Sequence, residues 1–133
     1  MKELIGKRIS GISVSDDQHL LVFYHPDGQF TAYDTYGDCC SETWFADIVG
    51  VSALLNGVVE RADEIPISEV YEADDSRSRQ VFDKVYGVKL KTDRGYVDIA
   101  YRNSSNGFYG GDISIFQGEI TENLTPITAD WSA

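Results

Sequence analysis

The chain has 133 residues, 42% of them hydrophobic, and its 11 basic and 22 acidic residues give a formal net charge of −11. This length suits a single domain over residues 1–133 with a core of its own. The longest apolar run, Leu20–Tyr24, is far shorter than the roughly 20 residues that cross a bilayer, so we expect a soluble protein with no membrane partner. Residues 1–8 lack the apolar stretch of a signal peptide, which predicts a cytoplasmic location.

The charges are unevenly distributed. No Lys or Arg occurs between Ile9 and Glu60, although that span holds eight acidic residues. Binding to a phosphate backbone needs a basic surface, so we expect no direct contact with nucleic acid. Simple solubility explains such acidity. The alternative is a surface that mimics nucleic acid or attracts a basic partner.

The sequence of the first half of the chain predicts a hairpin followed by a helix. Two extended runs, 20–25 and 30–33, flank the turn Pro26-Asp27-Gly28. Ser41 is placed to cap a helix over residues 42–49 that ends at Gly50, and residues 53–57 predict one more helical turn. From Val58 onward the chain reads as extended, with Pro66 favouring an edge strand or a break.

The second half predicts a polar mobile loop at 74–80, a hairpin and a last strand. Apolar residues alternate over 88–92 and 97–101 around the turn Asp93-Arg94-Gly95, and residues 112–116 form another extended run. The tail from Gly118 has no firm pattern. We therefore expect an α+β fold, a strongly bent antiparallel sheet of about six or seven strands with one or two short helices at about 41–55 packed on it.

Residues 37–45 gather chemically versatile side chains. A disulfide between the adjacent Cys39 and Cys40 would be strained, so we expect two thiols. The simpler interpretation places one thiol in the core and the other in the loop. A thiolate nucleophile assisted by His25 and Asp38 is the alternative. Zinc would need both cysteines and both histidines at poor spacing, so we expect no metal and no other cofactor.

The second notable segment is the loop 102–111, where amides and hydroxyls precede two aromatic residues and a glycine pair. A tight turn into the last strand explains most of it, and a ligand-binding loop is the sharper interpretation. The two loops supply the candidate partner- or ligand-binding residues, to none of which we assign a catalytic role: Asp38, Cys39, Cys40, Ser41, Glu42, Trp44, Asn103, Ser104, Ser105, Asn106 and Tyr109.

The motifs Gly-Asp-Cys-Cys-Ser-Glu-Thr-Trp-Phe at 37–45 and Asn-Ser-Ser-Asn-Gly-Phe-Tyr-Gly-Gly at 103–111 resemble a small family of uncharacterised phage and bacterial proteins, a domain of unknown function. The resemblance extends from about Leu4 to about Ile115. It implies a phage or prophage setting, inside the host cell, and no particular reaction.

The expected function is a non-enzymatic acidic protein that binds a host protein, such as an inhibitor or nucleic-acid mimic acting on a defence or replication factor. The alternative is a protein that binds a small polar ligand, or an enzyme, with a site formed by loops 37–44 and 103–111. The sequence leaves the oligomeric state open.

Overall fold

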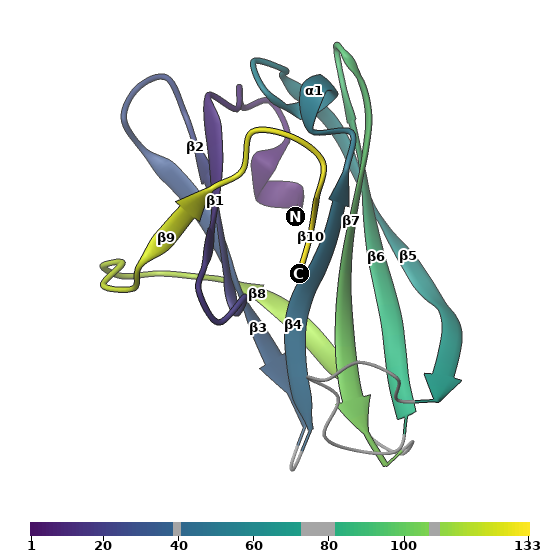
Figure 1. Cartoon of the computed structure of the whole chain (residues 1–133). Coiled ribbons are helices and arrows are strands. Elements are labelled where there is room, and N and C mark those ends of the chain that lie inside the picture. Colours follow the sequence, from purple (N-terminus) through teal and green to yellow (C-terminus); the bar gives the residue numbers. More distant parts are fainter. Residues whose placement is uncertain (39–40, 73–81, 107–109) are drawn as a thin grey trace.

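The structure of the protein is a computed structural model that describes residues 1–38, 41–72, 82–106 and 110–133, with residues 66–72 described by their backbone only. Within these described residues, two five-stranded antiparallel sheets face each other, and one short α-helix lies at one end (Figure 1). The described elements are η1 (Lys2–Leu4), β1 (Gly11–Ser15), β2 (Leu20–Tyr24), β3 (Phe30–Gly37), β4 (Glu42–Val49), α1 (Val51–Leu54), β5 (Val59–Glu72), β6 (Phe82–Thr92), β7 (Gly95–Ser105), β8 (Gly111–Ile115), β9 (Leu124–Pro126) and β10 (Trp131–Ser132).

The strand order is β8-β3-β2-β1-β9 in the first sheet and β10-β4-β7-β6-β5 in the second. The main core lies between them. On β6, Val88 and Leu90 are buried while Lys89 between them is exposed, because successive side chains of a strand point to opposite faces. Leu4 of the 3-10 helix η1, near the N-terminus of the chain, is buried in the same core.

A second, smaller core covers the outer face of the first sheet. Leu20 and Val22 of β2 are buried there against Phe116, Ile120 and Leu124 of the segment that follows β8. Leu21 and Phe23 of the same strand face the main core. Strand β2 is therefore buried on both faces, which accounts for its unbroken apolar run.

The C-terminal segment joins one edge of each sheet. Strand β9 pairs with β1, Ile127 is buried in the main core, and β10 pairs with β4. The opposite side of the molecule is bounded by β8 and β5, the terminal strands of the two sheets. These two strands belong to different sheets and flank a groove described below.

Several sequence predictions about the fold are confirmed, and the predictions of a helix at 42–49 and of a single bent sheet are wrong. The hairpins β2–β3 and β6–β7 form as expected, residues 111–115 are a strand, and β5 is an edge strand whose register shifts between Ile65 and Glu69, around Pro66. A helical turn forms at Val51–Leu54. The mobile loop expected at 74–80 falls outside the described residues.

The predicted helix at 42–49 is instead strand β4, and Ser41 caps no helix. Trp44 and Phe45 are both almost fully buried, and adjacent residues reach opposite faces only in a strand. The β-branched and aromatic residues of this segment also favour a strand. Because the chain passes from β3 of the first sheet to β4 of the second, the expected single bent sheet is two sheets and the fold is mostly β. The patternless tail supplies β9 and β10.

Candidate functional site

The two predicted loops lie side by side at the corner where the chain passes from β3 to β4. Strand β4 pairs with β7 in a register that sets Thr43 opposite Asn103 and Glu42 opposite Ser104. The backbone N–H of Asp38 donates to the Gly110 carbonyl (3.1 Å), and the Gly110 N–H donates to Asp38 Oδ2 (3.3 Å). Tertiary structure thus brings together segments more than 60 residues apart in the chain.

The side chain of Asn103 is the centre of this corner. It is fully buried, and its Nδ2 donates to Ser41 Oγ (3.0 Å) and to Thr43 Oγ1 (2.9 Å). The two hydroxyls in turn donate to the carbonyls of Asp38 (2.6 Å) and Tyr36 (3.0 Å). Since both hydroxyl protons are used, the oxygens accept from Asn103, which fixes its amide orientation. Its Oδ1 has no hydrogen-bond partner among the described residues.

The glycine pair after the second loop permits close packing against this corner. Gly111 donates its N–H to the Tyr86 hydroxyl (3.1 Å), and a β-carbon at position 111 would overlap the Thr43 side chain. A β-carbon at Gly110 would lie 2.6 Å from the Tyr86 hydroxyl oxygen. The glycines are therefore explained by the approach of β8 to β4 and β6, whether or not a ligand binds there.

The other candidate residues occupy different surroundings. Ser105 is buried, Asn106 is exposed, and Ser104 and Trp44 are buried on the face of β4 and β7 opposite to Asn103. Cys39, Cys40 and Tyr109 fall outside the described residues. The structure thus brings Asp38, Ser41 and Asn103 together at this corner. The roles of Cys39, Cys40 and Tyr109 remain predictions.

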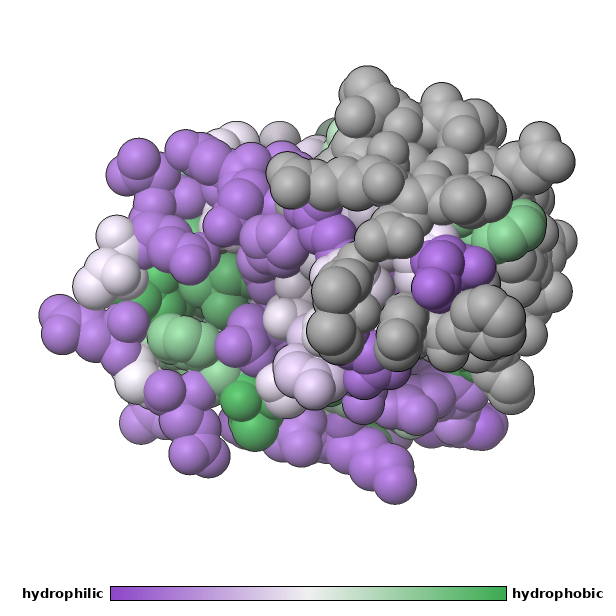
Figure 2. All heavy atoms as spheres, turned by 90° about the horizontal axis from the view of Figure 1, so that it is seen from below, coloured by the Kyte–Doolittle hydropathy of each residue, from purple (hydrophilic) through white to green (hydrophobic). Residues whose placement is uncertain are grey.

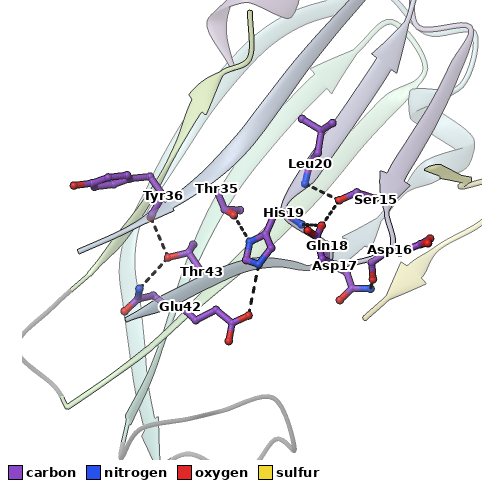
Figure 3. Close-up of polar contacts among 11 residues, drawn as sticks. Ser15, Asp16, Asp17, Gln18, His19, Leu20, Thr35, Tyr36, Glu42 and Thr43 are labelled. Atoms are coloured by element: carbon purple, nitrogen blue, oxygen red, sulfur yellow. Dashed lines mark hydrogen bonds and ion pairs between the residues drawn. The ribbon is translucent and has the colours of Figure 1, made fainter. Parts of the chain in front are cut away.

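A histidine that the site prediction did not include links the first sheet to this corner (Figure 3). His19 contacts Thr35 through Nδ1 (2.7 Å to Oγ1) and lies 3.6 Å from Glu42 through Nε2. Asp17 fixes the turn before it by accepting hydrogen bonds from Ser15 Oγ (2.6 Å) and the His19 N–H (3.0 Å). The turn Ser15-Asp16-Asp17 can be recognised in the sequence, but the approach of His19 to Glu42 of β4 depends on tertiary structure.

Hydroxyl, imidazole and carboxylate follow one another here in the order of an acyl-transfer triad. The 3.6 Å separation between His19 and Glu42 exceeds the roughly 2.6–3.2 Å reach expected for such a relay. Thr35 also lies within β3, paired with Ile113 of β8. Through these contacts, His19, directly before β2, connects Thr35 of β3 to Glu42 at the start of β4.

His25 does not join the corner. Its Nδ1–H donates to the Arg8 carbonyl (2.8 Å), and Nε2 contacts Thr31 Oγ1 (2.8 Å). Thr31 lies near the start of β3 and Asp38 directly follows its last residue, seven positions later and on the order of 20 Å away at strand spacing. The hypothesis of a thiolate assisted by both His25 and Asp38 is therefore wrong, because the two groups lie at opposite ends of the strand.

Two neighbouring hollows, both lined by Glu64, together make up a groove on the side of the molecule bounded by β5 and β8. The upper part of the groove, next to η1, has a volume of about 610 Å³ and is lined by Glu3, Tyr33, Ala62 and Ile113 among others. A backbone hydrogen bond lowers the pKa of the Glu3 carboxyl below its usual value, and the hydrogen bond that this carboxyl accepts from the Tyr33 hydroxyl (2.8 Å) lowers it further. Burial, and then this bond, raise the pKa of Tyr33 far above its usual value.

The lower part of the groove, about 400 Å³, is lined by residues of both sheets. Tyr86 and Tyr101 stack there with ring centroids 5.0 Å apart, between Glu64 of β5 and Asp112 of β8. Burial raises the pKa of Tyr101, and the Asp112 and Glu64 carboxylates raise it further. Two carboxylates thus act on the same buried phenol from opposite walls.

Basic residues are segregated from the first sheet. Residues 11–37 and 111–126, which include all five of its strands, contain no Lys or Arg, whereas they contain the acidic residues Asp16, Asp17, Asp27, Asp34, Asp112, Glu119 and Glu122. Lys7 approaches this sheet from the N-terminal segment and donates to Thr31 (3.4 Å). Viewed from the corner end, the described surface is mostly hydrophilic with a smaller hydrophobic area (Figure 2).

The described part of the chain lacks two further features. No group of three or more His, Cys, Asp or Glu residues is placed there to hold a metal ion. No helix among the described residues is both long and apolar enough to cross a membrane.

Comparison with known proteins identifies an uncharacterised relative and a family. It is 27% identical over 120 residues to the uncharacterized protein L278 of Acanthamoeba polyphaga mimivirus, covering 84% of this chain and 88% of that protein. No solved structure matches the chain. Residues 2–115 match the family model described as a domain of unknown function, DUF7448. The chain therefore belongs to the DUF7448 family.

Proposed function

We propose that this protein is a non-enzymatic binding protein whose acidic first sheet engages a basic protein of a host cell. The supporting observation is the segregation of charge between the sheets. The fold joins two stretches without Lys or Arg, 11–37 and 111–126, into one sheet with seven carboxylates. A surface of one sign attracts partners of the opposite sign and accelerates their association.

The mimivirus relative supports a viral setting, and the proposal places the protein in the cytoplasm of an infected host cell. A phage or prophage origin belongs to the same proposal. The partners that fit are proteins with a basic surface, such as nucleic-acid-handling factors of host defence or replication, which an acidic protein could block by occupying their nucleic-acid site.

The test is affinity purification from host lysate at low and high salt, followed by measurement of the purified pair. We expect a partner with a basic surface that is retained at low salt and released at high salt, because salt screens exposed charges. Absence of any such partner would contradict the proposal.

Matched variants locate the surface. D16N/E119Q/E122Q removes three exposed carboxylates from the side of the first sheet, and D47N/E60Q/D98N removes three from the second. Both variants change the net charge equally. We expect the first to weaken binding by about tenfold or more and the second to have a much smaller effect, since a tenfold change needs only about 1.4 kcal/mol. Equal losses would indicate a non-specific attraction.

A second candidate function is binding of a small polar ligand at the corner of loops 37–44 and 103–111. The observation that favours it is the buried Asn103 Oδ1, which has no hydrogen-bond partner among the described residues. A ligand N–H or O–H donor would satisfy this oxygen. A crystal structure would test this: ordered density of a small molecule within hydrogen-bond distance of Oδ1 supports it, and a lone water there contradicts it.

A further inference from the structure

The groove between β5 and β8 combines features that single it out from the rest of the acidic surface. Among the described residues, β5 pairs only with β6, and β8 pairs only with β3, so each strand ends its sheet. The groove therefore lies between two sheet edges, and both sheets contribute to its walls. Its lower part is within the roughly 300–1,000 Å³ range of small-ligand sites, at about 400 Å³.

The two ends of the groove differ in charge. In the upper part, Lys2 accompanies the carboxylates, and Asp63 is paired with Arg61 (3.0 Å). The described lining of the lower part contains Glu64 and Asp112 and no Lys or Arg. Among the described lining residues, no basic side chain therefore balances the two carboxylates at the rim of the lower part.

The walls of the lower part are aromatic. The stacked pair consists of Tyr101, which is buried, and Tyr86, which is half-buried, and both border the hollow. Tyr86 is also fixed by its hydrogen bond with the Gly111 N–H. Aromatic rings attract cations, and a guanidinium group can stack on a ring while its N–H groups donate to carboxylates.

An arginine side chain fits this hollow better than a peptide strand that pairs with the edge of β8 would. Along β8, the Gly111 N–H is bonded to Tyr86 and the Ile113 N–H to Asp112 Oδ1 (2.8 Å). A peptide adding to this edge would have to displace both side-chain acceptors, so strand addition gains little. A side chain entering between the carboxylates needs no such displacement.

We infer that the hollow formed by Glu64, Tyr86, Tyr101 and Asp112 receives an arginine side chain from the basic partner. This inference rests on the proposed function and specifies where that partner inserts its anchor. The guanidinium lies against the tyrosines, and its N–H groups donate to Glu64 on one wall and Asp112 on the other.

The test is amide chemical-shift mapping by NMR on the full chain, titrated with N-acetyl-arginine amide. We expect saturable shifts at Glu64, Gly87, Gly111 and Asp112, and weaker binding of N-acetyl-lysine amide, which lacks a planar group that can stack. Shifts confined to other regions, no saturable shifts, or equal binding of the lysine compound would each overturn the inference.

Two double variants test the carboxylates directly. E64Q/D112N removes both wall charges, and D98N/E122Q removes two exposed charges outside the groove. We expect about tenfold weaker arginine binding in the first and a change below about twofold in the second. Similar losses in both would overturn the inference. Superimposable spectra away from the groove confirm that each variant is folded.

The same variants separate this inference from the proposed function. If a salt-sensitive basic partner binds E64Q/D112N as tightly as the original protein, the arginine site is wrong and the binding function stands. If no such partner exists, the proposed function fails, whatever the arginine compound does.

Discussion

Asn103 and Thr43 face each other across β7 and β4 and are also joined by a side-chain hydrogen bond of 2.9 Å. The Asn103 amide also donates to Ser41 Oγ. One buried amide therefore binds both Ser41, directly before β4, and Thr43 within β4. Thr43 Oγ1 in turn donates to the Tyr36 carbonyl of β3 (3.0 Å), and this bond links the start of β4 in the second sheet to the first sheet.

Replacing Asn103 with alanine should destabilise the protein by about 2–3 kcal/mol, because two buried hydrogen bonds are lost at roughly 0.5–1.5 kcal/mol each and a small cavity is left. Chemical denaturation measures the change. In a double-mutant cycle with Thr43→Val, the combined loss should be smaller than the sum of the single losses. Ser114→Ala, at an exposed hydroxyl, serves as the control and should change stability by less than about 1 kcal/mol.

Gly111→Ala should cost about 1–3 kcal/mol, because the new β-carbon overlaps Thr43 and lies 3.1 Å from Asn103 Cβ. The cost should fall when Thr43 is also changed to alanine, which removes the overlapping atoms. Gly11→Ala is the matched control in β1, where a β-carbon would meet Tyr24 at an ordinary 3.5 Å. Thermal unfolding compares the variants. Equal effects at both glycines would contradict the close approach.

Tyr33 and Tyr101 should remain protonated well above pH 10, the ordinary pKa of a tyrosine phenol. Burial raises both pKa values, with carboxylates adding to the shift. The folded state then holds these protons more tightly than the unfolded state. Their contribution to stability is present below the unfolded pKa near 10 and is lost as the pH rises toward the folded values.

Alkaline titration of phenolate absorbance measures this effect. Among the eight tyrosines of the chain, we expect a late group that ionises only at higher pH or on unfolding. Tyr33→Phe and Tyr101→Phe should each reduce that late group by one. Full ionisation of the native protein near pH 10 would show that these phenols are not shielded.

Asp130→Ala should destabilise the attachment of the C-terminal segment by about 1–2 kcal/mol, in the range of a lost helix cap. Asp130 Oδ1 accepts the N–H groups of Gly50 (2.9 Å) and Val51 (3.0 Å) at the start of α1. Faster amide hydrogen exchange at these two residues is the expected signature. Asp130→Asn keeps an acceptor oxygen and should lose less, while exposed Asp47→Ala should leave the exchange unchanged.

Local patterns in the sequence were sufficient for the hairpins. The apolar runs of β2 and β3 flank Pro26-Asp27-Gly28, and the alternation of β6 and β7 surrounds Asp93-Arg94-Gly95, so neighbouring residues specify each turn and its pairing. The alternative interpretation of the sequence joined loops 37–44 and 103–111 in one site. Pairing of β4 with β7 brings them into contact.

The helix prediction at 42–49 failed because a capping serine is a local signal, whereas the state of this segment depends on burial on two faces. Phe45 packs between the sheets and Trp44 is buried on the opposite face, and the burial of both side chains favours a strand. Nothing within the segment itself reveals the second buried face.

By itself, the sequence determined the excess of carboxylates, the span without Lys or Arg, and the hairpins, because these depend on composition and near neighbours. Only the tertiary structure decided that residues 111–126 join residues 11–37 in one acidic sheet, that Asp130 caps α1 from 80 positions away, and that Glu64 faces Asp112 across a groove. These contacts arise from burying two sheets against each other, and they link residues that no local pattern connects.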